Sequence, residues 1–114
     1  MFASAFSIND KGYVATGFDD YFVSTSNDIN MKDVWEYDPS SNSWAQKASF
    51  PGFGRVGSVS FSLNGKGYIC NGFLAKNGAY TTAAHTNEVW SFDPALNAWN
   101  QEDNFDGAPR SFAF

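Results

Sequence analysis

The sequence predicts an all-β protein made of two copies of one four-stranded antiparallel unit, and three observations support this fold class. The stretch 33–44, DVWEYDPSSNSW, recurs 55 residues later at 88–99 as EVWSFDPALNAW, and a repeat of this period indicates an array of equivalent units. Aromatic residues make up 18% of the chain, and they fit the pleated surface of a sheet. The 10 Gly and 4 Pro lie between apolar runs, where turns are expected, and no stretch has helical periodicity.

The repeat covers the whole chain without an insertion. Even Phe114, the last residue, has a counterpart in Ser4. We expect the first unit over residues 1–55, the second over 56–109, and the start of the first strand of a further unit at 110–114. The matched pairs include Phe6 and Phe61, Asn9 and Asn64, Tyr13 and Tyr68, Gly17 and Gly72, Phe50 and Phe105, Gly52 and Gly107, and Arg55 and Arg110.

Each unit begins with a predicted tight hairpin. Apolar residues alternate with small polar ones up to a compact turn that contains Asn and Gly, and Gly supplies positive φ there. The first strands are placed at 2–8 and 57–63, the turns at 9–12 and 64–67, and the second strands at 13–17 and 68–72.

The repeated stretch predicts a second hairpin in each unit. Its turn opens with Asp-Pro, and the Asn that follows tolerates the left-handed conformation. Two longer loops, 18–32 and 73–86, separate the hairpins, and in them the copies share almost nothing beyond the first Phe. The third strands are placed at about 33–37 and 88–92, and the fourth strands at about 44–48 and 99–103.

These features resemble the kelch repeat, whose unit is one four-stranded blade of a β-propeller. The family pattern has a glycine pair after the second strand, a Tyr followed by a Trp across the next hairpin, and an Arg before the next blade. In this chain the glycine pair is degenerate, and Phe92 stands in place of the Tyr. The residues that carry the blade signature are Gly17, Trp35, Tyr37 and Trp44 in the first unit, and Gly72, Trp90, Phe92 and Trp99 in the second.

The resemblance implies two kelch blades that form part of a closed β-propeller. The first strand of each blade is expected to line a central channel, the fourth to lie outermost, and the aromatic pair to lie between blades. Propellers have about four to eight blades, so two blades alone would leave aromatic faces in water. We therefore expect copies of the chain to join head to tail, as a homotrimer with six blades or, as the next alternative, a homotetramer with eight. The other interpretation is an excerpt of a longer single-chain propeller.

Charge and composition exclude several classes of function. The net charge of −5, with Lys and Arg scattered along the chain, argues against a nucleic-acid partner. No apolar run is long enough to cross a bilayer, so no membrane partner is predicted. Cys70 is the single cysteine and is expected to be a buried strand residue, which leaves the cellular compartment unknown.

Two arginines are the first candidates for ligand binding. Arg55 and Arg110 precede the first strand of a blade, at the end of the propeller where the loops 18–32 and 73–86 also emerge. The guanidinium fork matches carboxylate geometry, so these residues are candidates for holding a carboxylate or an acidic peptide, and a sugar is also a candidate ligand. The alternative is that each Arg pairs with an acidic neighbour between blades.

The two long loops supply the other candidate binding residues. These are Asp19 and Tyr21 in the first loop, and Lys76, Tyr80 and His85 in the second. The acidic residues do not match the spacing of a calcium loop, and a single His does not predict a metal site. We therefore predict no metal, no cofactor and no catalytic residue.

The sequence favours a non-enzymatic scaffold or binding module that assembles with itself. The alternative is a fragment of a bacterial sugar-active kelch enzyme, similar to an epimerase, or of a carbohydrate-binding protein. The aromatic pair leads to one further prediction. If both rings are buried between blades, Trp44→Ala and Trp99→Ala should each lower the free energy of unfolding by about 3 to 5 kcal/mol.

Overall fold

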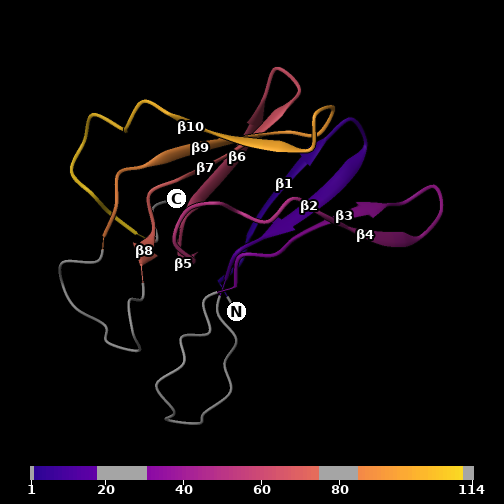
Figure 1. Cartoon of the computed structure of the whole chain (residues 1–114), viewed down its shortest axis with the longest axis horizontal. Coiled ribbons are helices and arrows are strands. Elements are labelled where there is room, and N and C mark those ends of the chain that lie inside the picture. The colour runs from indigo at the N-terminus through magenta and orange to yellow at the C-terminus, as the bar shows by residue number, and fades with distance from the viewer. Residues whose placement is uncertain (1, 18–30, 75–84, 112–114) are drawn as a thin grey trace, which may run out of the picture.

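The computed structural model describes residues 2–17, 31–74 and 85–111 of the chain. These residues form β-strands and no α-helix, which confirms the predicted all-β fold class. Two four-stranded antiparallel sheets follow one another along the chain, as predicted (Figure 1). The first sheet contains β1 (Ser4–Ile8), β2 (Lys11–Ala15), β3 (Val34–Asp38) and β4 (Ser43–Lys47), and the second contains β6 (Val59–Leu63), β7 (Lys66–Cys70), β9 (Val89–Asp93) and β10 (Ala98–Glu102).

The strand boundaries differ from the prediction by one or two residues at most ends, and the shift of β2 and β7 arises because the first turn of each sheet is tighter than expected. Asn9 and Asp10 adopt positive φ, at 50° and 64°, and they alone connect β1 to β2. Turns with positive φ at both central residues match the twist of the strands that they join. As a result β2 begins at Lys11 rather than at Tyr13.

The repeat extends to the backbone conformation. Each described residue with positive φ has a counterpart 55 positions away that also has positive φ, and the agreement is close for Gly17 at 106° and Gly72 at 109°. The six pairs are Phe2 and Gly57, Asn9 and Asn64, Asp10 and Gly65, Thr16 and Asn71, Gly17 and Gly72, and Asn42 and Asn97. The two sheets are therefore two copies of one structural unit.

The structure also contains a small sheet that the sequence does not predict. β5 (Arg55–Val56) pairs with β8 (Phe73–Leu74), so that Arg55 lies opposite Leu74. The sequence predicts a loop at 73–86, because a two-residue strand is too short to show an alternating pattern. This pairing holds the backbone of Arg55 beside the segment that follows β7.

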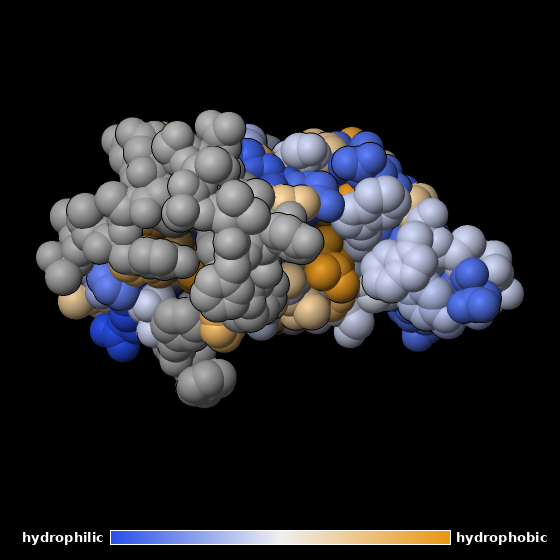
Figure 2. Space-filling model, turned by 90° about the horizontal axis from the view of Figure 1, so that it is seen from below, coloured by the Kyte–Doolittle hydropathy of each residue, from blue (hydrophilic) through white to orange (hydrophobic). Residues whose placement is uncertain are grey.

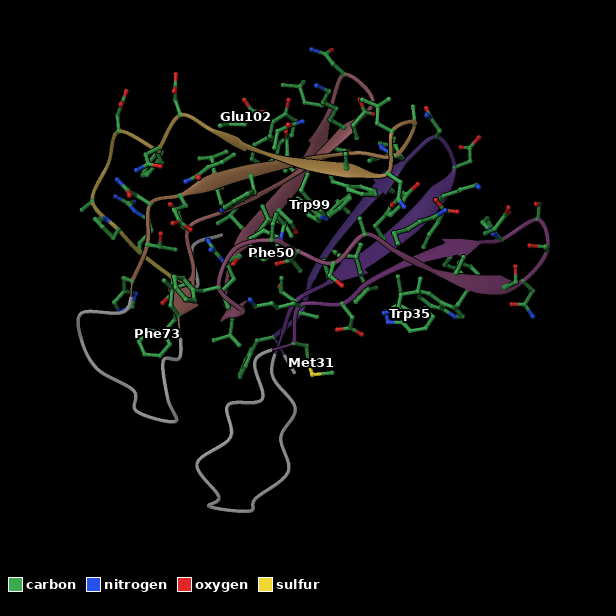
Figure 3. The ribbon with its side chains drawn as sticks, viewed as in Figure 1. Met31, Trp35, Phe50, Phe73, Trp99 and Glu102 are labelled. Atoms are coloured by element: carbon green, nitrogen blue, oxygen red, sulfur yellow. The ribbon has the colours of Figure 1, made fainter. Side chains whose placement is uncertain are left out.

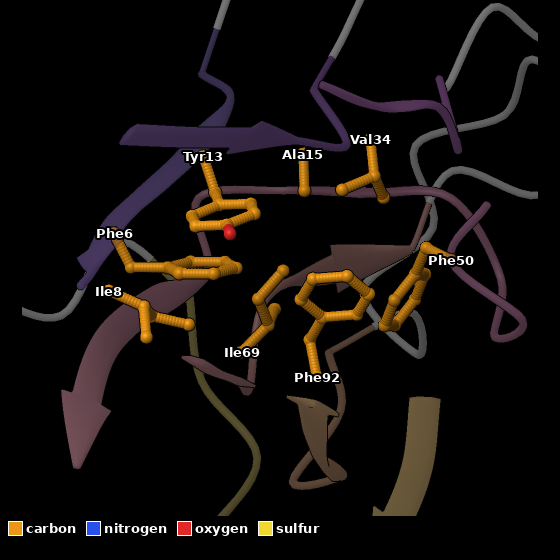
Figure 4. Close-up of a cluster of buried hydrophobic side chains, with 8 residues drawn as sticks. All are labelled: Phe6, Ile8, Tyr13, Ala15, Val34, Phe50, Ile69 and Phe92. Carbon is orange, nitrogen blue, oxygen red and sulfur yellow. The ribbon is translucent and has the colours of Figure 1, made fainter. Parts of the chain in front are cut away.

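The buried core lies between the two sheets (Figure 4). β1 alternates buried and exposed residues, and its buried side faces the second sheet beside β6 and β7. Tyr13 is central, because its ring stacks on Phe6 at 5.4 Å between centroids and meets Phe92 of the second sheet at 5.7 Å. We call this contact between the sheets the inner interface. Its core residues are Phe6, Ile8, Tyr13, Ala15, Val34 and Phe50 from the first repeat unit, with Ile69 and Phe92 from the second.

Candidate binding interface

The inner interface is built around the ring of Phe50, which follows β4. Phe50 is 1% exposed, and its ring meets those of Trp90 and Trp99 edge-on, with centroids 5.4 and 5.1 Å apart. Figure 3 shows Phe50 and Trp99 together between the sheets, with Trp35 well apart from them. The Trp99 indole Nε1 donates to the carbonyl of Ala48 at 2.9 Å, so the aromatic contact is also fixed by a hydrogen bond.

Arg55 is completely buried in the same interface. Its guanidinium Nη2 pairs with the Glu88 carboxylate at 2.7 Å, and its Cζ lies 4.8 Å from the centroid of the Phe50 ring. Nη1 donates to the carbonyl of Asn71 at 3.4 Å, and Nε donates to that of Phe53 at 3.2 Å. Every nitrogen of the guanidinium therefore has a partner, and Arg55 links the end of the first repeat unit to the second sheet.

The ion pair between Arg55 and Glu88 holds its charges despite burial. Partial burial raises the pKa of Glu88, but hydrogen bonds from Arg55 and from the Trp90 indole outweigh it and hold that pKa below its ordinary value. Burial lowers the pKa of Arg55 more than the hydrogen bond and charge of Glu88 raise it, yet an arginine stays charged at neutral pH. The interface is thus joined by a charged pair in addition to its rings.

A second network of charges supports the first sheet from within. The Glu36 carboxylate accepts a hydrogen bond from the Tyr13 hydroxyl at 2.7 Å and pairs with Lys11 at 3.1 Å and Lys47 at 3.5 Å. Burial raises the pKa of Glu36, but these partners outweigh it and keep the group ionised. The same burial, together with Glu36, raises the pKa of Tyr13, so that Tyr13 stays protonated. The network is structural, since Tyr13 and Glu36 are both buried.

A glycine lets the two sheets approach closely at one point. A Cβ atom at Gly67 in β7 would overlap the ring of Phe6, which therefore packs directly on the second sheet's backbone. Ser60 in β6 donates to the carbonyl of Ala5 at 2.7 Å across the same contact. Only Gly leaves room for an aromatic ring at this distance from the backbone.

On the side facing away from the first sheet, the second repeat unit presents the counterparts of residues that the first unit buries in the inner interface. We call this surface the trailing face and define it by Phe61, Tyr68, Phe105 and Arg110. Arg110 is exposed, and its Cζ lies 5.1 Å from the centroid of the Phe105 ring, much as Arg55 lies over Phe50. Phe61 and Phe105 are 43% and 40% exposed, whereas their counterparts Phe6 and Phe50 are buried.

The first sheet presents the matching surface on its own far side. We call it the leading face and define it by Gly12, Asp33, Trp35, Tyr37 and Trp44. Trp44 is 56% exposed, and its ring meets that of Tyr37 at 5.1 Å, as Trp99 meets Phe92 at 5.1 Å. In Figure 2 the end of the molecule that carries the β3–β4 hairpin is pale to blue, and the apolar residues gather nearer the middle. The leading face is thus aromatic and polar rather than aliphatic.

The predicted aromatic pairs therefore differ in their surroundings. Phe92 and Trp99 lie between the sheets, as expected for a pair between blades. Tyr37 and Trp44 lie on the leading face, where Trp44 is exposed in the isolated chain, so the burial of its ring between blades stays a prediction. Trp44 is exposed because no sheet within the described residues covers that side of β3 and β4.

The structure separates the residues proposed for ligand binding. Arg55 takes the alternative role of pairing with an acid between the sheets, and Arg110 is exposed. His85 is exposed and its ring lies 5.1 Å from that of Phe73. The remaining candidates, Asp19, Tyr21, Lys76 and Tyr80, lie outside the described residues.

Several other classes of site find no support in the described parts of the chain. No group of three or more His, Cys, Asp or Glu side chains gathers there in a way that suits a metal ion. None of the elements in these parts is a helix long and apolar enough to span a membrane. Cys70 is half-buried, its thiol donates to the Val59 carbonyl at 3.7 Å, and burial raises its pKa. A thiol of this kind is a poor nucleophile.

The sequence does not single out three residues, namely Glu88 and Gly67 of the inner interface and Asp33 of the leading face. Glu88 and Asp33 each stand two positions before a Trp in the repeated stretch, and that shared position was the available signal. The sequence predicts that Gly67 lies in a turn, whereas it lies in β7 and receives the ring of Phe6. Nothing in one sequence distinguishes a glycine of a turn from one that accepts a ring.

Comparison with known proteins places the fold among propellers. The chain matches no family model. It is 35% identical over 65 residues to an N-acetylneuraminate epimerase of Yersinia enterocolitica, a match that covers 56% of this chain and 16% of that protein. It superposes on the solved structure of YjhT, a β-propeller, with a TM-score of 0.75 and 21% identity, over 96% of this chain and 39% of that one. The chain thus spans less than half of either protein.

These comparisons identify each four-stranded sheet as the equivalent of one propeller blade. The likeness to YjhT shows that the two sheets have the fold of part of a β-propeller. The inner interface is then a contact between neighbouring blades. The leading and trailing faces are the surfaces where further blades would lie.

Proposed function

We propose that this chain is a non-enzymatic propeller scaffold whose copies join head to tail, trailing face on leading face, into a closed ring. One observation carries the proposal: the main side chains of the inner interface have counterparts 55 residues away on an open face, and the described geometry there is nearly the same. Phe50 over Arg55 matches Phe105 over Arg110, and the pair Phe92 and Trp99 matches Tyr37 and Trp44. The molecule therefore carries both halves of an interface that it already forms once.

The open faces have a physical reason to associate. Phe61, Leu63 and Phe105 on one side and Trp35 and Trp44 on the other are each more than a third exposed. Burying an aromatic ring removes apolar area from water and gains edge-on ring contacts. Exposed apolar side chains on a sheet face favour a partner that covers them.

Ring closure follows from the heterologous character of the contact. A trailing face meets a leading face and not another trailing face, so the contact propagates until the rotation closes. Three copies would supply six blades and four copies eight, both within the range of about four to eight blades. We favour the ring of three copies.

Light scattering coupled to size exclusion tests the proposal. The expected result is a particle of three or four chains, with a mass that is a multiple of 12.5 kDa, at micromolar concentration. Phe105→Ala should shift the particle toward single chains, because it removes the ring that enters the interface. A wild-type chain that stays single up to the highest soluble concentration would refute self-assembly.

The match to N-acetylneuraminate epimerase favours a second candidate, a sugar-binding or sugar-active fragment. Arg110 and His85 are its exposed candidates among the described residues, and an exposed guanidinium suits a sugar carboxylate. The test is a glycan binding screen that contains acidic and neutral sugars, with Arg110→Ala as the variant. Binding of an acidic sugar that this variant abolishes would support the candidate function. No binding to any sugar in the screen would contradict it.

A further inference from the structure

We infer that Arg110 is an interface residue whose partner is Asp33 of a second copy of this chain. The inference rests on the proposed function and deepens it, because it names the charged pair at the centre of the contact between copies. It also gives Arg110 a role different from ligand binding.

The inner interface provides the template. Arg55 pairs with Glu88 at 2.7 Å, and Glu88 also accepts a hydrogen bond from the Trp90 indole Nε1 at 3.3 Å. Subtracting the repeat of 55 residues from Glu88 and Trp90 gives Asp33 and Trp35. An acidic residue therefore stands at the equivalent place on the leading face.

The donor side is already arranged in the isolated chain. Arg110 lies over the ring of Phe105, and its Nε donates to the carbonyl of Ala108 at 3.1 Å, just as Arg55 Nε donates to that of Phe53 at 3.2 Å. A Cβ at Gly107 would meet both the Phe105 ring and the Arg110 guanidinium. Little further ordering is needed for Arg110 to receive a carboxylate, and preorganised groups bind at a lower entropic cost.

The acceptor side has the same arrangement with a shorter acid. Asp33 Oδ2 accepts a hydrogen bond from the Trp35 indole Nε1 at 2.6 Å, which orients the carboxylate beside the exposed ring. Asp33 is half-buried, and no cation pairs with it among the described residues. Within the part of the chain that the structure describes, the trailing face thus offers an Arg without an acid, and the leading face offers an acid without a cation. This charge complementarity favours a second copy as the partner.

Charge reversal tests the pair. Arg110→Glu and Asp33→Arg should each weaken association by about a hundredfold, because each places like charges at the contact. The double variant Arg110→Glu with Asp33→Arg should restore the wild-type particle, since the pair is then reversed in every copy. The readout is native mass spectrometry across a dilution series, with a thermal melt of each variant to verify folding.

Two further variants keep the test interpretable. Asp33→Asn retains an oxygen for the Trp35 indole but removes the charge, so it should weaken association without unfolding the chain. Leu96→Glu also adds negative charge, but at the β9–β10 turn, where Leu96 is 72% exposed and belongs to neither open face, and it should assemble like the wild type.

The outcomes separate the two proposals. If both charge reversals assemble as tightly as the wild type while Phe105→Ala does not, the pair is wrong and self-assembly through the rings stands. If the double variant fails to recover while it remains folded, the pair is also wrong. If the wild-type chain is single at all concentrations, both proposals are overturned.

Discussion

The inner interface and the two open faces contain the same kinds of residue in the same local geometry, yet only the first is buried. Phe50 is 1% exposed and Phe105 is 40% exposed, although each lies beneath an arginine at about the same distance. Phe6 is buried against Gly67, whereas Phe61 is 43% exposed. The difference lies in the neighbour and not in the repeat unit itself. Burial in a propeller blade is thus supplied by the adjacent blade.

The largest difference is expected between Phe50→Ala and Phe105→Ala. Phe50→Ala removes a buried ring between two tryptophans and should lower the free energy of unfolding by about 3 to 5 kcal/mol. Phe105→Ala should cost about 0.5 kcal/mol in the single chain, since its ring is already partly in water. Urea denaturation at nanomolar concentration, where chains are single, measures both. An equal decrease in the free energy of unfolding for the two variants would show that Phe50 and Phe105 do not differ in burial.

The two equivalent tryptophans should show a smaller version of the same contrast. Trp99→Ala removes the ring contact with Phe50 and the hydrogen bond to the Ala48 carbonyl. We expect the free energy of unfolding to fall by about 2 to 3 kcal/mol, because the ring is only half-buried. Trp44→Ala should cost about 1 kcal/mol or less in the single chain and more in the assembled particle. The same denaturation experiment, run at low and high concentration, checks this. A concentration-independent cost for Trp44→Ala would contradict its placement at a contact between copies.

Gly67→Ala sharpens the comparison at the closest contact of the two sheets. The added methyl group would overlap the Phe6 ring, so the ring or the strand must move, and overpacking of this kind costs about 1 to 3 kcal/mol. Thermal melts of the variant and of the wild type measure the loss of stability. A variant as stable as wild type would show that Phe6 does not press on β7 as described.

The smallest expected effect is on the pH dependence of stability. The folded chain holds the pKa of Glu88 below that of an unfolded glutamate, about 4.3. The ion pair with Arg55 thus stabilises the fold above that pH, and the contribution is lost as the pH falls through the folded pKa. Glu88→Gln should be less stable at pH 7 and should lose less on acidification from pH 5 to pH 3. Denaturant titrations at pH 7, 5 and 3 measure the free energy of unfolding of both proteins. The same pH dependence for Glu88→Gln and for the wild type would contradict a stabilising ion pair between Glu88 and Arg55.

The sequence was sufficient to predict most of the fold. The 55-residue offset, the alternating stretches and the turns with Asn and Gly placed both four-stranded sheets in the right order, with ends within two residues for most strands. The pair β5 and β8 was missed because two residues cannot show a period. Strand pattern and turn chemistry are local properties, and local properties can be read from a sequence.

The interface was harder to predict because it depends on contacts between distant residues. The burial of Arg55 follows from Glu88, which is 33 residues away, and the role of Gly67 follows from Phe6. Equivalent residues also have opposite surroundings, as Trp44 and Trp99 show, although their sequence contexts are alike. A repeat identifies which surfaces correspond, but the identity of the neighbour decides which of them are buried.

The most direct test of the central claim is the native mass of Gly12→Ala beside that of the wild type. Gly12 corresponds to Gly67, but a Cβ there meets no atom closer than the Cβ of Tyr37 at 3.9 Å, so the single chain should tolerate the change. In a ring of copies the Phe61 ring of a neighbour would lie at that place. We predict wild-type particles of three or four chains, and Gly12→Ala chains that are equally stable but single. The same mass for both proteins, assembled or not, would contradict the claim that the open faces meet as the inner faces do.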